Sequence, residues 1–245
     1  MIDGPVLCID ATDVVGDEGI LAASRAYDEL ACRATFVTSA FLVGAAAGAP
    51  AVLAVPAEPF SRQLDDAAGR GAPASVRVGL LADGAQVARV ATLLDTLDRA
   101  RTVVAPVTRI AGGAVMDRDA IDATRRELFP RARVVVLRAG DVARWTDTGC
   151  DRVEDLGRAA AAIREAGARA VLISGWAGEG RIVDLVDDDG RVTLLDTTRV
   201  AAPRIGGISA AHSAALSARL AAGDALEAAA ATAQRYVGSR LRRGL

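Results

Sequence analysis

The segment Val6-Leu-Cys-Ile-Asp10-Ala-Thr-Asp13-Val-Val-Gly16-Asp-Glu-Gly19-Ile20 contains the pattern on which the whole chain is built. Val6–Asp10 is a short apolar run of the kind that forms strands buried on both faces. Ala11–Gly19 carries acids and glycines, which mark a loop, and an amphipathic stretch begins at Ile20. We therefore expect a strand, a loop and a helix, which together form the first half of a βαβ unit.

The same alternation of short apolar runs and amphipathic stretches continues nearly to the end of the chain. Such alternation is typical of βα units on a mostly parallel sheet. The further expected strands are Ala34–Phe41, Ala51–Val55, Ser75–Gly79, Thr102–Ala105, Arg133–Val136 and Ala170–Ile173. The expected helices are Ile20–Leu30, Pro59–Gly69, Gly84–Asp98, Arg118–Leu128, Val153–Ala166, Ile208–Ala221 and Ala225–Ser239.

A hairpin interrupts this rhythm, because Asp187-Asp-Asp-Gly190 is a strong turn signal between two short apolar runs, Arg181–Val186 and Arg191–Leu195. The three acids could belong to a metal cluster, but acids in a turn are more often solvated, and we favour a solvated turn. The sequence therefore predicts one α/β domain over residues 1–245. It has three layers, with a mostly parallel central sheet, helices on both faces and a small antiparallel hairpin at one edge.

Composition excludes several classes of partner. The chain is 51% apolar and only 3% aromatic, so Val, Leu, Ile and Ala must fill the core. A formal net charge of -2 without a basic block predicts no nucleic-acid partner and no membrane surface. The charge-free stretch Ala34–Ala57 contains Gly44, Gly48, Pro50 and Pro56, which favours two buried strands over a membrane span.

The chemistry of the side chains is also restricted. The chain contains no Lys and no Asn, a single His and three widely spaced Cys, so Schiff-base chemistry and a conventional metal site are not indicated. Met1-Ile-Asp-Gly-Pro5 lacks the basic flank of a signal peptide. We therefore expect a reducing, cytoplasmic location. A homodimer is the commonest assembly, but the sequence does not determine it.

Two segments resemble the hydroxymethylpyrimidine/phosphomethylpyrimidine kinases of the ribokinase-like superfamily. Cys8–Ile20 resembles the family's A-G-S-D-P-S-G-G-A-G-I, and Arg77-Val-Gly79-Leu-Leu-Ala82 resembles its K-I-G-M-L-A. The order of elements agrees over nearly the whole chain. The resemblance implies a ribokinase-like fold and ATP-dependent phosphorylation of a small pyrimidine alcohol of the thiamine-precursor type, with ATP and Mg²⁺ as cofactors.

The family's G-T-G-C anion hole at a helix N-terminus corresponds to Gly207-Ile208-Ser209-Ala210, preceded by Gly206. The resemblance implies that backbone N–H groups of Gly206, Gly207, Ile208 and Ser209 bind an anion there. The family's Cys, which is placed to take the substrate proton, is replaced by Ala210. A simple helix start with Ser209 near the cap explains the stretch about equally well.

Other family landmarks are altered in the same way. The family's D-P-V, T-P-N-x-x-E and K-G-G-H correspond here to Ala105–Val107, Leu137–Val142 and Ser174–Ala177, so the magnesium-organising acids are absent. By resemblance, the substrate pocket would include Asp13, Gly16, Val43 and Gly79, and the nucleotide side would include Arg138, Ser174 and Gly175. No metal ligand is assigned. Asp13 could equally form an Asx-type turn, and Asp10 could be the buried partner of an Arg.

Three functions remain open at this point. The first is a kinase acting on the hydroxymethyl group of a small heterocycle. The second is a non-catalytic or regulatory relative, a pseudoenzyme that binds a small anionic or heterocyclic ligand in the same cleft. The third is a hydrolase that uses Ser209 and His212, and it is the weakest because the sequence suggests no acid to orient the histidine.

Overall fold

The computed structural model describes residues 4–13, 18–44, 48–201 and 206–244, so the predicted site residue Gly16 lies outside the described residues. The strands are β1 Val6–Asp13, β2 Ala34–Val43, β3 Ala51–Ala54, β4 Ser75–Val78, β5 Thr102–Val104, β6 Arg109–Ile110, β7 Gly113–Ala114, β8 Val134–Arg138, β9 Ala170–Gly178, β10 Arg181–Asp188 and β11 Arg191–Thr198. The helices are α1 Gly19–Glu29, α2 Ala57–Ala68, α3 Gly84–Leu94, α4 Arg118–Glu127, α5 Asp155–Glu165, α6 Ile208–Ala221 and α7 Leu226–Arg243, with 3-10 helices η2 Arg99–Arg101, η3 Phe129–Arg131 and η4 Ala139–Arg144.

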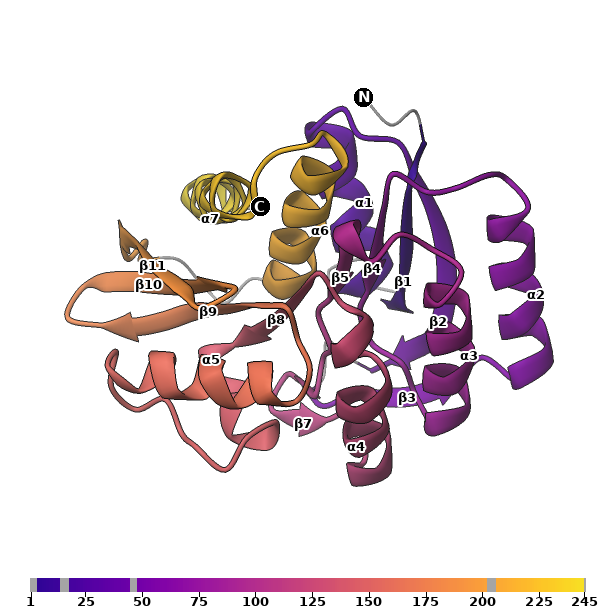
Figure 1. Cartoon of the computed structure of the whole chain (residues 1–245), viewed down its shortest axis with the longest axis horizontal. Coiled ribbons are helices and arrows are strands. Elements are labelled where there is room, and N and C mark those ends of the chain that lie inside the picture. The colour runs from indigo at the N-terminus through magenta and orange to yellow at the C-terminus, as the bar shows by residue number, and fades with distance from the viewer. Residues whose placement is uncertain (1–3, 14–17, 45–47, 202–205, 245) are drawn as a thin grey trace.

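The central sheet has nine strands in the order β11-β10-β9-β8-β5-β4-β1-β2-β3. The pairs from β2 through β9 are parallel, while β3 at one edge and β10 and β11 at the other are antiparallel. Helices α1, α6 and α7 cover one face, and α2, α3, α4 and α5 cover the other (Figure 1). The predicted three-layer α/β architecture with an edge hairpin is confirmed.

The core explains why the strand positions could be read from the sequence. The central strands consist of fully buried β-branched and aliphatic residues, such as Val103–Val104 in β5 and Val171–Ile173 in β9. Both faces of such strands meet helices, so the sequence is continuously apolar. Helix α6 is buried nearly all round because it lies between α1, α7 and the sheet, which its many alanines permit (Figure 1).

The β10–β11 hairpin turns at Asp189 and Gly190, both with positive φ, as a two-residue type I′ turn requires. The prediction that the three acids of this turn are solvated holds for Asp189, which is exposed, and is wrong for Asp187, which is buried. Asp187 is buried and lies 3.5 Å from Arg164, Asp188 accepts two 2.8 Å bonds from Arg133, and Asp189 lies 3.3 Å from Arg169. Each acid therefore ties the hairpin to an arginine of a neighbouring element. The hydrogen bonds from Arg133 are the main reason that the pKa of Asp188 is lowered.

The other sheet edge departs from expectation in its burial. β2 and β3 form the predicted pair, but β3 is mostly exposed, with Leu53 at 54% and Phe41 of β2 at 49%. As an edge strand, β3 has one side of its ladder unpaired and few neighbours to cover its side chains. Within the described residues, no helix is long and apolar enough to span a bilayer.

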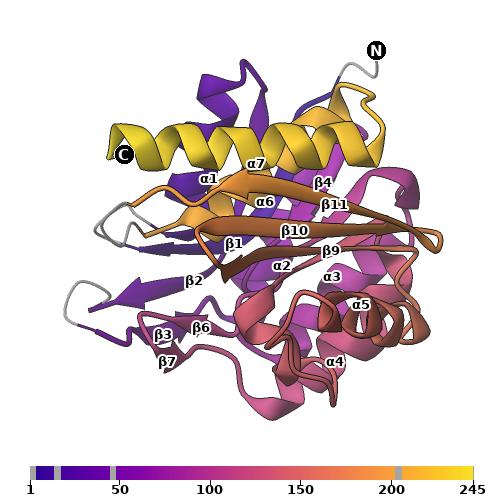
Figure 2. The ribbon, with the colours of Figure 1, turned by 90° about the vertical axis from the view of Figure 1, so that its left-hand side faces the viewer.

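Several short elements were not predicted, among them the 3-10 helices η2 and η3. The β6–β7 pair lies beside the β2–β3 edge (Figure 2), and η4 follows β8. Strands of two residues carry no periodic signal.

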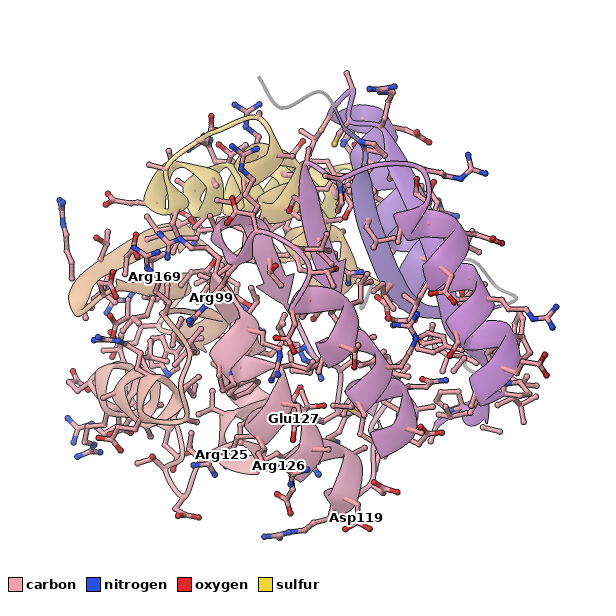
Figure 3. All side chains as sticks on the ribbon, turned by 45° about the vertical axis from the view of Figure 1, so that its right-hand side comes forward. Arg99, Asp119, Arg125, Arg126, Glu127 and Arg169 are labelled. Atoms are coloured by element: carbon pink, nitrogen blue, oxygen red, sulfur yellow. The ribbon has the colours of Figure 1, made fainter. Side chains whose placement is uncertain are left out.

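By contrast, the amphipathic character of α4 was clear from the sequence. Asp119, Arg125 and Arg126 point outward from this helix, as the side-chain view shows (Figure 3), while Ala120 and Ala123 face the core.

Candidate active site at the carboxyl edge of the sheet

Two cavities adjoin each other where the parallel strands end, the usual ligand-binding edge of such sheets. The large cavity, of about 460 Å³, lies between the start of α6, the end of α7, η4 and the β10–β11 hairpin; α7 runs alongside this hairpin (Figure 2). The small cavity, of about 110 Å³, lies between the end of β1, the start of α1 and the start of α6. Both cavities are lined by Arg109, Arg138, Ile208 and Ser209.

The start of α6 forms part of the wall between them. Gly207 caps the helix with φ +69°, a conformation that favours glycine, and Ser209 makes no side-chain capping bond. Gly207, Ile208, Ser209 and Ala210 all line the small cavity, whereas Gly206 is exposed. The predicted anion-hole backbone is thus at the cavity, and the methyl group of Ala210 stands at the position where the family carries a proton acceptor.

The carboxyl group of Glu18 lies beside this backbone site. Glu18 precedes α1 and lines the small cavity together with Gly207, whose backbone N–H acts to lower the pKa of the Glu18 carboxyl group. Burial raises the pKa of Glu18, and the charges of Asp10 and Asp13 act in the same direction, while Gly207 N–H and Arg138 oppose them. An acid of the chain itself therefore lies beside the backbone that the sequence predicts as an anion hole. Sequence reasoning missed Glu18 because it stands where the resembling motif has an alanine.

Asp10 has a structural role in this wall. Its Oδ1 accepts from the backbone N–H groups of Ala11 and Leu80, both at 2.8 Å, and its Oδ2 lies 2.8 Å from Nη1 of the fully buried Arg77. Burial by itself lowers the pKa of Arg77, but the charge of Asp10 more than offsets it, so that pKa is raised. The expectation that Asp10 partners a buried Arg is confirmed.

The residues predicted for the substrate pocket do not all reach the small cavity. Asp13 is buried, and its Oδ1 accepts from the backbone N–H of Glu18 at 3.4 Å, a span of five residues where an Asx-type turn spans two. Val43 is 45% exposed at the end of β2, and Gly79 packs against Asp10. None of these three lines either cavity. Asp13 therefore contacts the cavity residue Glu18 without lining the cavity itself.

The nucleotide-side residues Arg138, Ser174 and Gly175 do come together at the large cavity. Arg138 donates from Nε to Asp141 at 2.7 Å and from Nη2 to the carbonyl oxygen of Arg109 at 3.1 Å. These contacts hold the guanidinium group at the junction of the two cavities. An arginine fixed in this way presents its remaining N–H groups to an anion such as phosphate.

A histidine–aspartate pair lies in the wall of the same cavity. Nε2 of His212 is 3.4 Å from Oδ2 of Asp184, whose Oδ1 accepts from the backbone N–H of Gly175 at 2.7 Å. Both side chains are buried, and neither ring nitrogen of His212 has a hydrogen-bond partner. Asp184 is the acid that sequence reasoning did not find for His212, because it comes from the distant edge hairpin. No hydrogen bond joins His212 to Ser209 in the described part of the chain, so the pair does not form a nucleophile–base arrangement.

The residues at the junction do not fit a magnesium site. Among residues 4–13, 18–44, 48–201 and 206–244, no group of three acids, histidines or cysteines is placed to hold a metal ion. Val142 is fully buried, and Ala105 offers only a methyl group. Positive charge at the junction comes instead from Arg109 and Arg138.

Comparison with known proteins agrees with this geometry. The chain is 30% identical over 234 residues to the hydroxymethylpyrimidine/phosphomethylpyrimidine kinase of Rhizobium meliloti, covering 94% of this chain and 88% of that protein. It is 28% identical over 243 residues to the thiamine biosynthesis bifunctional protein ThiED of Geobacter sulfurreducens, of which it spans about half, 49%.

Solved structures agree on the fold. The pyridoxal kinase from Staphylococcus aureus in complex with AMP-PCP and pyridoxal superposes with a TM-score of 0.88 at 23% identity, covering 98% of this chain and 88% of that one. Residues 13–245 match the phosphomethylpyrimidine kinase family over nearly the whole chain. With its ribokinase-like sheet and its ligand cavities at the carboxyl edge, the chain belongs to the phosphomethylpyrimidine kinase family.

Proposed function

We propose that this protein is a phosphotransferase that binds ATP in the large cavity and a small nitrogen heterocycle bearing a hydroxymethyl group in the small cavity. The observation that carries the proposal is the meeting of the two cavities at Arg109, Arg138 and the N-terminus of α6. A phosphoryl group passing between two bound reactants needs such a junction, where positive charge and backbone N–H groups face the transferred oxygens.

The sizes and walls of the cavities support this division. The large cavity is within the range of sites that hold drug-sized ligands, and it combines apolar side chains such as Val237 and Leu241 with polar ones such as Gln234. The small cavity has room for a single ring. Its walls combine apolar residues, Leu42, Leu80, Val107 and Ile110, with the carboxylates of Asp10 and Glu18, which suits a flat heterocycle with polar substituents.

The relatives support the choice of reactants. Those named above include a hydroxymethylpyrimidine kinase and a pyridoxal kinase in complex with AMP-PCP and pyridoxal. Pyrimidine and pyridine alcohols share a six-membered ring and a primary hydroxyl group. We therefore propose one of these two substrate classes, with the hydroxymethylpyrimidine class first because the family match covers residues 13–245.

The test has a binding part and a turnover part. Calorimetry should show binding of AMP-PCP, and Arg138→Ala should weaken it about 10- to 100-fold, because hydrogen bonds to a charged group contribute about 1.5–3 kcal/mol. The matched control is Arg144→Ala, an exposed arginine at the end of η4, the 3-10 helix that follows Arg138, and it lines neither cavity. A coupled assay with hydroxymethylpyrimidine, its monophosphate and pyridoxal then measures turnover. Absence of both binding and turnover would refute the proposal.

A second candidate, a non-catalytic ligand-binding relative, is favoured by one observation: residue 210, at the family's proton-acceptor position, is Ala. Such a protein would keep both cavities and bind nucleotide and heterocycle without transferring phosphate. Binding of AMP-PCP together with no detectable turnover of any of the three alcohols would select this function over the first.

A further inference from the structure

The geometry points to Glu18, on the wall of the small cavity, as the proton acceptor of the reaction, replacing the side chain that is missing at residue 210 of the same cavity. This inference rests on the proposed phosphotransferase function. It concerns a residue on the loop before α1, whereas the missing acceptor belongs to α6.

Phosphoryl transfer to a hydroxyl group requires a proton acceptor at the α6 end of the cavity. As the hydroxyl oxygen of the substrate attacks the γ-phosphorus, its proton must leave, and a positioned base contributes about 10²–10⁴ in rate. Ala210 has no group that can accept it. Among the residues that the structure describes, two acids line the small cavity, Asp10 and Glu18.

Asp10 is unsuited to this task because its carboxylate is fully engaged. Two backbone N–H groups and Arg77 donate to it, all at 2.8 Å, and it is 1% exposed. Protonation of Asp10 would break the ion pair and leave the guanidinium of Arg77 buried without its charge partner, which is costly. Glu18 is therefore the remaining acid among the described residues of this cavity.

Glu18 is placed at the helix end where the phosphoryl group must be bound. It has an extended backbone at the N-cap of α1, and its carboxyl group is under the influence of the backbone N–H of Gly207, the N-cap of the helix α6 that carries Ala210. Both residues line the small cavity. A hydroxyl group directed at the start of α6 would therefore lie in the cavity that both Glu18 and the Ala210 methyl group line.

The surroundings of Glu18 also suit an acceptor. The groups that act on it are Asp10 and Asp13 from β1, Arg138 from β8 and the N–H of Gly207 at α6, and Arg109 of β6 lines the same cavity. Burial and the two aspartates raise the pKa of Glu18, which brings its basicity closer to neutral pH.

The transfer balances as follows. The hydroxyl oxygen forms a bond to the γ-phosphorus, the bond from that phosphorus to the bridging oxygen of ADP breaks, and the hydroxyl proton moves to the Glu18 carboxylate. Protonation removes the negative charge of Glu18 beside the incoming phosphoryl group. It also weakens the hold of Glu18 on the Gly207 N–H, which becomes available to a phosphoryl oxygen.

The test is Glu18→Gln, which keeps the shape of the side chain and an oxygen that can accept from Gly207. We expect kcat to fall by about 10²–10⁴, with nucleotide affinity within about threefold of wild type. The control is Asp28→Asn, the same change of acid to amide at an exposed position of α1, which should leave kcat unchanged. Ala210→Asp in the Glu18→Gln background should restore part of the lost rate by returning an acceptor to α6.

The wild-type pH profile supplies a measurement that does not depend on the folding of a variant. The profile of kcat should show an acid limb with a midpoint above pH 4.5, the ordinary value for Glu, and Glu18→Gln should lack it. Turnover by wild type without such a limb, or a kcat for folded Glu18→Gln within about threefold of wild type, overturns the role of Glu18 and leaves the phosphotransferase function intact. Nucleotide binding without wild-type turnover overturns both.

Discussion

A Cβ atom at residue 79 would lie 2.2 Å from Cγ of Asp10, so Gly79 makes room for the carboxylate that joins β1 to β4. We predict that Gly79→Ala lowers the free energy of unfolding by about 3 kcal/mol or more, because overpacking adds to the loss of a buried ion pair. Denaturant unfolding measures this change. Gly84→Ala is the control, since a Cβ there meets nothing within 4 Å and should cost almost nothing.

The strands and the site differed in how far the sequence could predict them. Runs such as Val103–Val104 were clear because a strand covered on both faces must be apolar throughout. The Gly79 and Ala210 positions followed from family motifs. The roles of Glu18 and Asp184 could not be predicted. Glu18 stands where the family motif has another residue. Asp184 comes close to His212 only because the edge hairpin folds against the start of α6.

The acids Asp187 to Asp189 show a further limit of sequence reasoning. A run of acids in a turn gives no sign of which arginines will face it. The partners Arg164, Arg133 and Arg169 come from elements that are distant in the chain and adjacent only in the sheet and its covering helix. Ion pairs of this kind can be identified only from the three-dimensional structure. The same holds for the exposure of β3 at the opposite edge of the sheet.

The buried pair of Asp10 and Arg77 leads to a second prediction. Arg77→Met should lower the free energy of unfolding by about 3–5 kcal/mol, because it leaves the carboxylate of Asp10 buried without a charge partner. Asp10→Asn combined with Arg77→Met should cost less than the sum of the two single changes. Arg62→Met, which removes the exposed pair with Glu58, serves as the control and should change stability little. Equal effects at Arg77 and Arg62 would contradict the structural role of the pair.

Glu18→Gln should also change stability in a direction that separates a catalytic from a structural role. The pKa of Glu18 is raised in the folded chain, so the folded state holds its proton more tightly than the unfolded state does. The wild type therefore loses stability, relative to Glu18→Gln, as pH rises from the ordinary pKa of Glu through the raised one. Thermal unfolding should show a higher Tm for Glu18→Gln at pH 7 and no difference near pH 3. A lower Tm at pH 7 would indicate that the Glu18 carboxylate mainly stabilises the start of α6.

The lowered pKa of Asp188 predicts the opposite pH dependence of stability at the edge hairpin. Hydrogen bonds from Arg133 lower its pKa, so its contribution to stability is present above the ordinary pKa of Asp and is lost as pH falls through the lowered value. Asp188→Asn should reduce Tm at pH 7 and have little effect at pH 2. Asp189→Asn, at the exposed pair with Arg169, should have a smaller effect at both values. A larger effect at Asp189 than at Asp188 would show that the bidentate contact with Arg133 adds little.

The last prediction concerns magnesium at the junction of the two cavities. Magnesium normally bridges phosphate oxygens and protein carboxylates, but here Ala105 and Val142 stand at the family's metal-organising positions, and Asp141 is held by Arg138. We expect magnesium to change the affinity for AMP-PCP less than tenfold in calorimetry, because Arg109 and Arg138 already supply positive charge to the phosphates. Arg138→Ala should weaken binding to a similar degree with and without the metal. Magnesium-dependent tightening of tenfold or more in wild type would mean that a carboxylate of the chain reaches the bound metal, with Asp141 released from Arg138 as the first candidate to examine.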